Sequence, residues 1–151
     1  MSEPHLAFFE PSGEIGAPAS SYAGLGGKGG FGAGPRNSRR SFWFDTDWVY
    51  FGCDAGSYES FCNVTVSAMK YSTTSQREEI AAISTFYLST CPGYKKCHLT
   101  RLDFGPEFRG LSGIMFEASV ADRSVGWYID NVAMSWNDTS CAAEVERTNS
   151  Q

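Results

Sequence analysis

Aromatic side chains are the residues of this sequence best suited to bind a ligand. The chain has 4 tryptophans and 7 tyrosines among its 151 residues. Flat aromatic rings pack against the apolar faces of sugars, so a protein that presents them on its surface can bind carbohydrate without catalysis. Each ring has an alternative role in the hydrophobic core. The candidate ligand-binding residues are Trp43, Trp48, Tyr50, Tyr71, Trp127 and Trp136.

Asp130 points to a second kind of chemistry, the binding of a hard cation. It stands in the otherwise mostly apolar run 127–132, where a buried carboxylate would need a cation, a base or backbone N–H donors. Ca²⁺ recruits carboxylates and carbonyls from several segments, and Glu10 near the start of the chain is a reasonable second ligand. We therefore predict Glu10 and Asp130 as calcium ligands. The alternative is an aspartate that faces solvent or caps a turn.

Patterns for catalysis or nucleotide binding are weak. The two histidines, His5 and His98, stand in no nucleophile motif, and there is no Gly-x-Ser-x-Gly sequence. The glycine-rich stretch 24–30 looks like a phosphate loop, but Lys28 precedes Gly29 rather than the serine or threonine of a Walker motif. No motif marks a glycosidase carboxylate pair. We expect that the protein is not an enzyme, and a glycan-active enzyme fragment is the weakest alternative.

The cysteines favour an oxidising environment. Cys53 with Cys62 and Cys91 with Cys97 lie close in the sequence, and turn-forming residues between them let the chain reverse within reach of a disulfide. We predict these two bridges, although five cysteines allow other pairings and Cys141 has no obvious partner. Disulfides are typical of secreted proteins. The alternative interpretation is that the cysteines are buried free thiols in a cytosolic protein.

Two Asn-x-Thr sequons also favour secretion. Asn63 and Asn137 begin them, and each is a candidate glycosylation site on a secreted chain. Residues 1–5 have neither the basic start nor the apolar stretch of a signal peptide. Either the leader is absent from this sequence or the chain is not secreted; we predict an extracellular protein.

Composition indicates one folded domain. A chain of 151 residues suits a single core, and 42% hydrophobic with 19% charged residues excludes a highly charged disordered protein. The net charge is −5, and no basic run is longer than Arg39-Arg40, which argues against a nucleic-acid partner. No apolar run approaches the roughly 18 to 20 residues that cross a bilayer, so we expect no membrane partner.

Alternating hydrophobic patterns predict β-strands and no helix. Strands are expected over residues 42–51, 63–70, 79–88, 99–104, 114–120 and 127–136. In the first of these, alternation puts one set of side chains on an aromatic face and the other on the opposite face: Phe42, Phe44, Thr46, Trp48 and Tyr50 against Trp43, Asp45, Asp47, Val49 and Phe51. Residues 80–83 alone are equally compatible with a helix. Regularly spaced strands separated by turn formers are typical of an all-β fold, an antiparallel sandwich or jelly roll.

The predicted chain has three segments. Residues 1–41 form a Gly- and Pro-rich segment that contributes one or two short strands, and nine of the 16 glycines lie between Gly13 and Gly34. Residues 42–136 form the body of the sandwich. Residues 137–151 are a polar tail, which we expect to be frayed.

Four segments of the body resemble a group of fungal secreted β-sandwich proteins. The segments are Phe44–Cys53, Cys62–Val66, Phe108–Phe116 and Tyr128–Val132, and the N-terminal Phe9-Glu10 and Tyr22–Leu25 are similar to that group's opening motifs. The resemblance implies a galactose-binding-like jelly roll, related in shape to carbohydrate-binding modules that often hold a structural calcium. It would again make Glu10 and Asp130 calcium ligands. It implies no activity, because fold does not determine function.

We therefore predict a secreted, non-catalytic β-sandwich that binds cell-wall or other carbohydrate through exposed aromatic rings. The rival hypothesis is a secreted structural or interaction protein without glycan binding, in which the rings fill the core. Exposed tryptophans would favour the carbohydrate hypothesis, and buried tryptophans would favour its rival. The sequence makes no prediction of oligomeric state.

Overall fold

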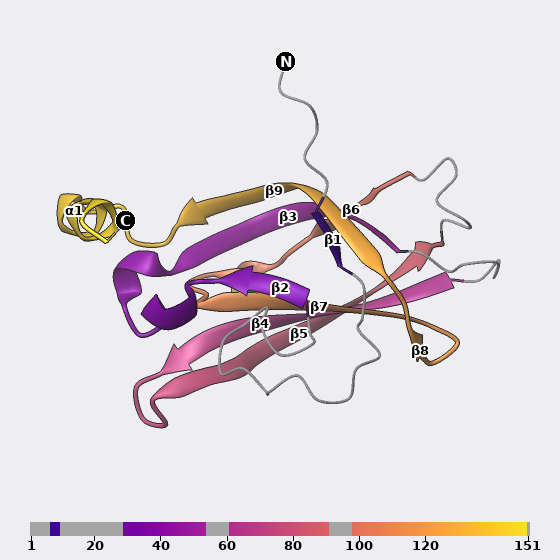
Figure 1. Cartoon of the computed structure of the whole chain (residues 1–151), viewed down its shortest axis with the longest axis horizontal. Coiled ribbons are helices and arrows are strands. Elements are labelled where there is room, and N and C mark those ends of the chain that lie inside the picture. The colour runs from indigo at the N-terminus through magenta and orange to yellow at the C-terminus, as the bar shows by residue number, and fades with distance from the viewer. Residues whose placement is uncertain (1–6, 10–28, 54–60, 91–97, 151) are drawn as a thin grey trace, which may run out of the picture.

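A computed structural model describes residues 7–9, 29–53, 61–90 and 98–150. They form two antiparallel sheets that pack face to face (Figure 1). Sheet A contains, in spatial order, β1 (Ala7–Phe9), β9 (Trp127–Trp136), β3 (Phe44–Cys53) and β6 (Thr100–Asp103). Sheet B contains β2 (Gly29–Gly32), β7 (Gly113–Val120), β4 (Phe61–Ser72) and β5 (Arg77–Ser89), with β8 (Arg123–Ser124) beside β7. This arrangement confirms the predicted antiparallel β-sandwich.

The strand order is that of a jelly roll. Apart from the two-residue β8, early strands pair with late ones in nested fashion: β1 with β9, β2 with β7, β3 with β6 and β4 with β5. The chain is therefore a long hairpin wrapped around one core, with successive strand pairs assigned alternately to sheet A and sheet B. The segment that was compatible with strand or helix is part of β5, which pairs with β4 from Arg77 to Ser89.

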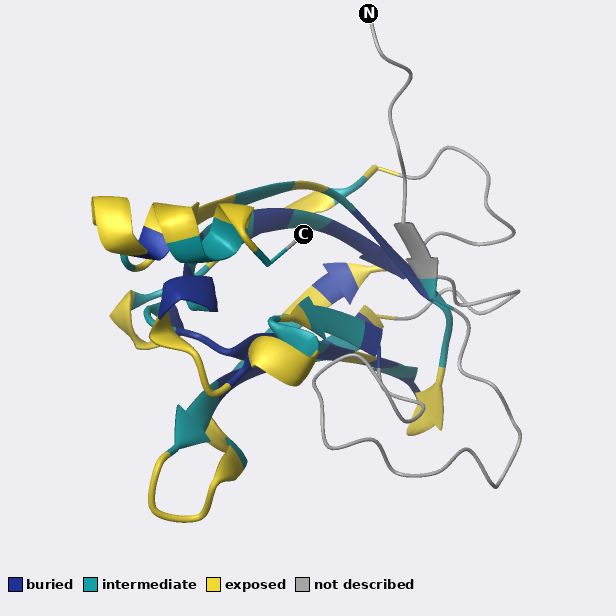
Figure 2. Ribbon diagram, turned by 60° about the vertical axis from the view of Figure 1, so that its left-hand side comes forward, coloured by how far each residue is buried: buried dark blue, intermediate teal, exposed yellow. Residues whose placement is uncertain are grey.

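The core lies between the sheets, where buried residues line the facing sides (Figure 2). Its centre is a stack of aromatic rings, in which Phe51 lies 5.6 Å from Phe116 and 5.4 Å from Trp127 between ring centroids. Phe9 of β1 stacks on the same tryptophan at 5.1 Å. Phe108, in the 3₁₀ helix η4 (Pro106–Phe108), is fully buried. These rings supply much of the apolar area that stabilises the fold.

A disulfide joins the two sheets. Cys53 ends β3 of sheet A, Cys62 lies near the start of β4 of sheet B, and their Cα atoms are 6.6 Å apart. Both side chains are fully buried. This bridge is one of the two predicted, whereas Cys91 and Cys97 lie outside the described residues. Cys141 is exposed and has no disulfide partner within the described part of the chain.

Two short strands, β1 and β2, come from the N-terminal segment. Glycine permits the close approach of β2 to its neighbours. A Cβ atom on Gly29 would lie 2.0 Å from the Trp127 ring, and one on Gly30 would lie 2.2 Å from the carbonyl oxygen of Ile114. Part of the glycine-rich region is therefore a strand whose packing excludes larger residues.

The C-terminal tail is helical, so the prediction of a frayed tail was wrong. Helix α1 (Cys141–Thr148) begins after Ser140, whose Oγ accepts a hydrogen bond from the backbone N–H of Ala143 at 3.3 Å. From the last turn, Nη1 of Arg147 donates to the carbonyls of Ser41 (2.6 Å) and Asp138 (3.0 Å). These polar contacts tie α1 to the 3₁₀ helix η2 (Arg40–Phe42). None of the described helices is long and apolar enough to span a membrane.

Candidate functional site

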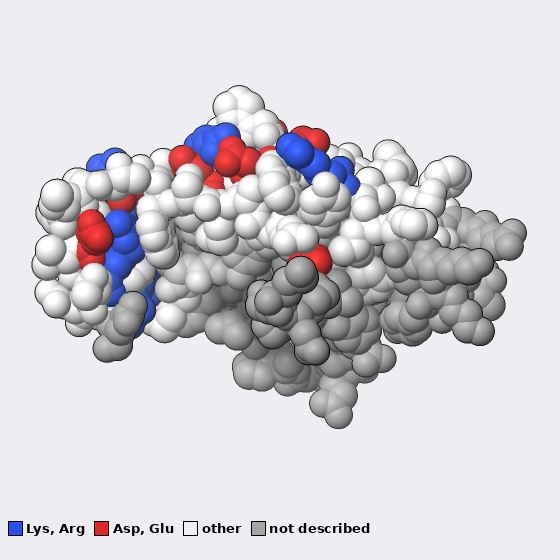
Figure 3. All heavy atoms as spheres, turned by 90° about the horizontal axis from the view of Figure 1, so that it is seen from above, with Lys and Arg blue, Asp and Glu red and all other residues white. Residues whose placement is uncertain are grey.

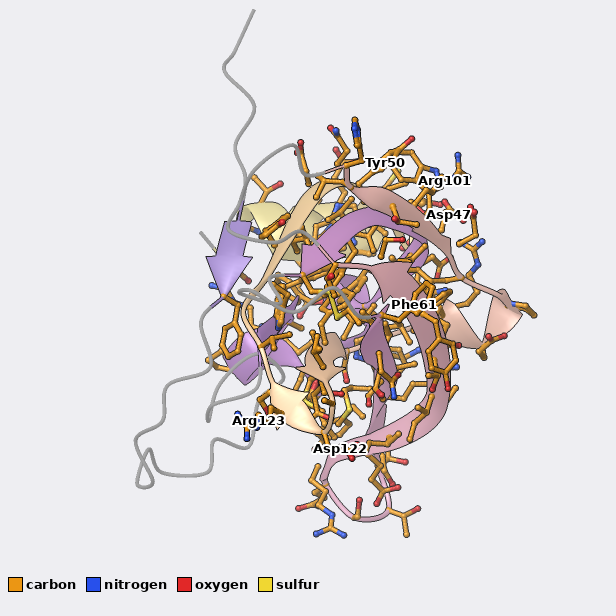
Figure 4. The ribbon with its side chains drawn as sticks, turned by 90° about the vertical axis from the view of Figure 1, so that its right-hand side faces the viewer. Asp47, Tyr50, Phe61, Arg101, Asp122 and Arg123 are labelled. Carbon is orange, nitrogen blue, oxygen red and sulfur yellow. A yellow bond between two sulfur atoms is a disulfide. The ribbon has the colours of Figure 1, made fainter. Side chains whose placement is uncertain are left out.

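The outer face of sheet A carries aromatic and charged side chains from two adjacent strands. Trp48 and Tyr50 of β3 lie on this face, opposite the buried residues of the same strand. Pairing with β6 brings Arg101 beside Tyr50 and Asp103 beside Trp48. Figure 4 shows Tyr50 and Arg101 together on the outer side of the sheet, with Asp47 nearby. We call Trp48, Tyr50, Arg101 and Asp103 the sheet A patch.

A β-bulge determines which residues of β3 reach this face. Thr46 pairs with Met134 and Trp48 with Ala133, so Asp47 is an extra residue in β3. Thr46 is fully buried, and after the bulge the buried positions shift by one residue along the strand. The prediction that Phe44, Thr46, Trp48 and Tyr50 share a face was therefore wrong, because the bulge reverses the alternation after Thr46.

The members of the sheet A patch contact one another. The rings of Trp48 and Tyr50 meet edge to face with centroids 5.6 Å apart. The guanidinium of Arg101 lies 4.8 Å from the centroid of the Trp48 ring, and its Nη2 is 2.6 Å from Oδ1 of Asp103. The side chains of Arg101 and Asp103 are 48% and 65% exposed. The patch thus combines two partly exposed rings with an accessible hydrogen-bond donor and an accessible acceptor.

Two further carboxylates hold neighbouring segments against β3. Oδ1 of Asp45 accepts hydrogen bonds from the backbone N–H of Gly110 at 2.7 Å and from Nδ2 of Asn137 at 2.9 Å. Asp47 forms an ion pair with Arg109. Acidic and basic side chains consequently lie side by side on this face (Figure 3). Asp45 and Asp47 position the segment after η4 and the end of β9 beside the patch.

The other aromatic candidates lie elsewhere in the fold. Trp127 is 4% exposed and belongs to the core. Trp43 follows η2, and its Nε1 donates to the carbonyl of Asn37 at 2.7 Å. Tyr71 is half-buried in β4 of sheet B. Trp136 is 46% exposed at the end of β9, on the inner side of sheet A, since it pairs in register with the inward-facing first residue of β3. The structure therefore brings together two of the six rings, Trp48 and Tyr50.

Asp130 lies in β9 opposite Tyr50 and is half-buried. Its Oδ1 accepts a hydrogen bond from the backbone N–H of Asn131 at 2.8 Å, at a residue with φ of 49°. Glu10 lies outside the described residues, within which no three His, Cys, Asp or Glu side chains gather around a common point. Ca²⁺ takes six to eight oxygen ligands, so the described residues alone do not form its site. Calcium binding through Glu10 and Asp130 stays a prediction.

The two sequon asparagines occupy different environments. Asn63 is half-buried within β4, between Tyr87 of β5 and Ser119 of β7. Asn137 is exposed directly after β9, where its side-chain amide already donates to Asp45. Attachment of a glycan at either position stays a prediction, and exposure makes Asn137 the more accessible acceptor.

The fold and the sheet A patch together define an all-β sandwich domain with an aromatic and charged outer face. A family model described as "Domain of unknown function (DUF7371)" matches residues 1–147. The chain belongs to this family. No curated protein and no solved structure matches it significantly.

Proposed function

We propose that this protein is a secreted, non-catalytic β-sandwich that binds carbohydrate on the outer face of sheet A. The observation that supports the proposal best is the sheet A patch. Its two adjoining rings, Trp48 and Tyr50, lie beside an exposed cation and an exposed carboxylate on a regular sheet. Sugar rings need this combination, since they present an apolar C–H face and a rim of hydroxyl groups.

In this proposal the C–H face of a sugar packs on the Trp48 indole. Arg101 donates hydrogen bonds to hydroxyl oxygens, and Asp103 accepts hydrogen bonds from hydroxyl groups. The ligand displaces the guanidinium of Arg101 from the ring, and this displacement costs little because a cation–π contact at an exposed site contributes about 0.5–1 kcal/mol. Binding of this kind needs no nucleophile or general base.

The position of the patch on an open sheet face suits a chain of sugar units. Both β3 and β6 present their outward side chains along the strand direction, so successive units can lie across Tyr50 and Trp48, where none of the described residues forms a wall that encloses a chain end. We therefore propose internal units of a cell-wall polysaccharide as the ligand class. We further propose that the jelly roll is of the galactose-binding-like type. The buried Cys53–Cys62 disulfide supports secretion.

The experiment is retention on insoluble β-glucan, chitin and mannan, followed by a glycan array. The wild-type protein should be retained on at least one polysaccharide. Trp48→Ala should lower the affinity about tenfold, which corresponds to about 1.4 kcal/mol. Trp136→Ala is the matched control, because it removes another half-exposed tryptophan, outside the patch, and should leave retention unchanged.

Failure of the wild-type protein to be retained on any of the three polysaccharides would overturn the proposal. It would favour the alternative, a structural or interaction protein that binds no glycan. Equal loss in Trp48→Ala and Trp136→Ala would also count against the patch. A thermal melt of each variant separates lost binding from lost folding, since both side chains are partly exposed and their removal should leave the fold intact.

A further inference from the structure

A pocket of about 370 Å³ opens at the end of the sandwich where α1 lies. Its apolar walls come from both sheets and from η2, and consist of Phe31, Phe42, Phe44, Met134 and Trp136. Among the described residues, β1 pairs only with residues 127–129 of β9, so the pocket lies beyond the end of β1, beside the last residues of β9. Its volume is within the range of small-molecule binding sites.

The walls expose apolar surface that the rest of the sandwich buries. Met134 and Trp136 pair in register with Thr46 and Phe44, whose side chains point into the core. Met134 and Trp136 nevertheless are each 46% exposed. Large apolar side chains that gather around a concave surface and stay exposed are typical of a ligand site. The pocket is separate from the sheet A patch, which lies on the opposite side of the sheet.

Two arginines complete the lining of the pocket. The guanidinium of Arg36 lies 5.1 Å from the centroid of the Phe42 ring, and that of Arg147 lies 4.7 Å from the centroid of the Trp136 ring. Both cations therefore lie over the aromatic walls, Arg147 half-buried and Arg36 exposed to solvent. They give an otherwise apolar pocket a positive charge.

The described residues neutralise the two cations only in part, since the charge of Arg147 helps to lower the pKa of the Asp138 carboxyl. Nη1 of Arg147 donates to the carbonyls of Ser41 and Asp138, and Nη2 of Arg36 donates to the carbonyl of Ser150. Carbonyls are uncharged, and no carboxylate of the described chain forms a salt bridge with either arginine. The other guanidinium nitrogens of both residues make no hydrogen bond to the described residues, so they are available to a ligand.

We propose that this pocket binds a small aromatic carboxylate. The aromatic body of the ligand packs against Phe44 and Trp136, and its carboxylate accepts hydrogen bonds from Arg36 and Arg147. Guanidinium groups match carboxylates geometrically, and hydrogen bonds between two charged groups are stronger than those between neutral groups. A neutral sugar offers neither the charge nor the apolar body, so this ligand class differs from that of the sheet A patch.

The test is isothermal titration of the full chain with naphthalene-2-carboxylate and with its uncharged counterpart of nearly equal shape, naphthalene-2-carboxamide. The carboxylate should bind at least tenfold more tightly than the amide. Arg36→Met should reduce this preference, because only Arg147 remains to hold the carboxylate, while Arg101→Met, the same change in the sheet A patch, should keep it in full. Trp136→Ala should weaken binding of both compounds, because it removes part of the apolar wall.

Arg36→Met is preferred over a change at Arg147, since Arg147 also holds α1 on η2. Equal affinity for the two compounds, or no binding of either, would overturn the proposal. Unchanged preference in Arg36→Met would overturn it as well, provided that the melting temperature shows a folded variant. Retention of Arg36→Met on polysaccharide should equal that of the wild type, so failure here is distinguishable from failure of the carbohydrate proposal.

Discussion

Removal of the Cys53–Cys62 disulfide should weaken the fold by an amount that follows from the loop it closes. The two cysteines are 9 residues apart in the sequence and connect the end of β3 to the start of β4. In the chain-entropy model, a loop of this length stabilises the folded state by about 2.6 kcal/mol at 25 °C, because it restricts the unfolded chain. For a domain of this size, the melting temperature should fall by about 5–10 °C.

The measurement is urea unfolding of the wild type and of Cys53→Ala/Cys62→Ala, each under oxidising and under reducing conditions. Under reducing conditions, the two proteins differ by the two buried sulfur atoms alone. The further difference in the free energy of unfolding between the two proteins under oxidising conditions measures the contribution of the cross-link. A second disulfide, such as the predicted Cys91–Cys97 bridge, contributes equally to both proteins and cancels.

The expected cross-link contribution is about 2–3 kcal/mol in the free energy of unfolding. A value below about 0.5 kcal/mol would refute the reasoning, because it would mean that the bridge does not form in solution or that the unfolded chain is already restricted around it.

Three further predictions concern β2, the helix start and the calcium hypothesis. Gly30→Ala should destabilise the fold by about 1–3 kcal/mol in urea unfolding, because its Cβ would approach the backbone of Ile114; an unchanged midpoint would contradict the packing of β2. Hydrogen bonds from the backbone and side chain of Ser140 lower the pKa of Asp138 below that of an exposed aspartate, about 3.9. The resulting stabilisation of the fold is present at pH values above the pKa of Asp138 in the unfolded chain, and it is lost as pH falls through the pKa of Asp138 in the folded chain. An NMR titration should show the lowered pKa of Asp138, and Ser140→Ala should raise it because the side-chain hydrogen bond is lost. Ca²⁺ should raise the melting temperature of the wild type and not that of Asp130→Ala, whereas a melt indifferent to chelator would count against the site.

The strands of the body were predictable because their two faces differ in polarity. In β4, alternation of Val64 and Val66 with polar residues identifies both the strand and its buried side. In β3 the odd-numbered positions change from the polar Asp45 and Asp47 to the apolar Val49 and Phe51, and the bulge at Asp47 makes the second set the buried one. The position of the bulge depends on the register with β9, a tertiary feature that simple alternation does not specify.

The candidate site was predictable in part. Aromatic type identified Trp48 and Tyr50, but nothing in the sequence separated them from the buried Trp127. Arg101 and Asp103 were missed, although their alternation with Leu102 marks them as outward residues of β6. What the sequence does not contain is the pairing of β6 with β3, which brings these charges beside the rings.

Helix α1 and the pocket were not predictable for a different reason. The helix is short and polar, and its signals are the Ser140 cap and the contacts of Arg147 with distant carbonyls. The pocket depends on where η2 and α1 lie relative to the two sheets. Both features depend on where segments end in space rather than on composition.

The most direct test of the carbohydrate proposal is an NMR titration that follows the four indole N–H resonances while a soluble oligosaccharide of the retained polysaccharide is added. The four tryptophans occupy four distinct environments: Trp127 is in the core, Trp43 donates to a carbonyl, Trp136 lines the pocket and Trp48 lies in the sheet A patch. We predict a saturable shift of the Trp48 resonance with the other three unchanged. A shift confined to Trp136, or no shift at any of the four, would contradict the account.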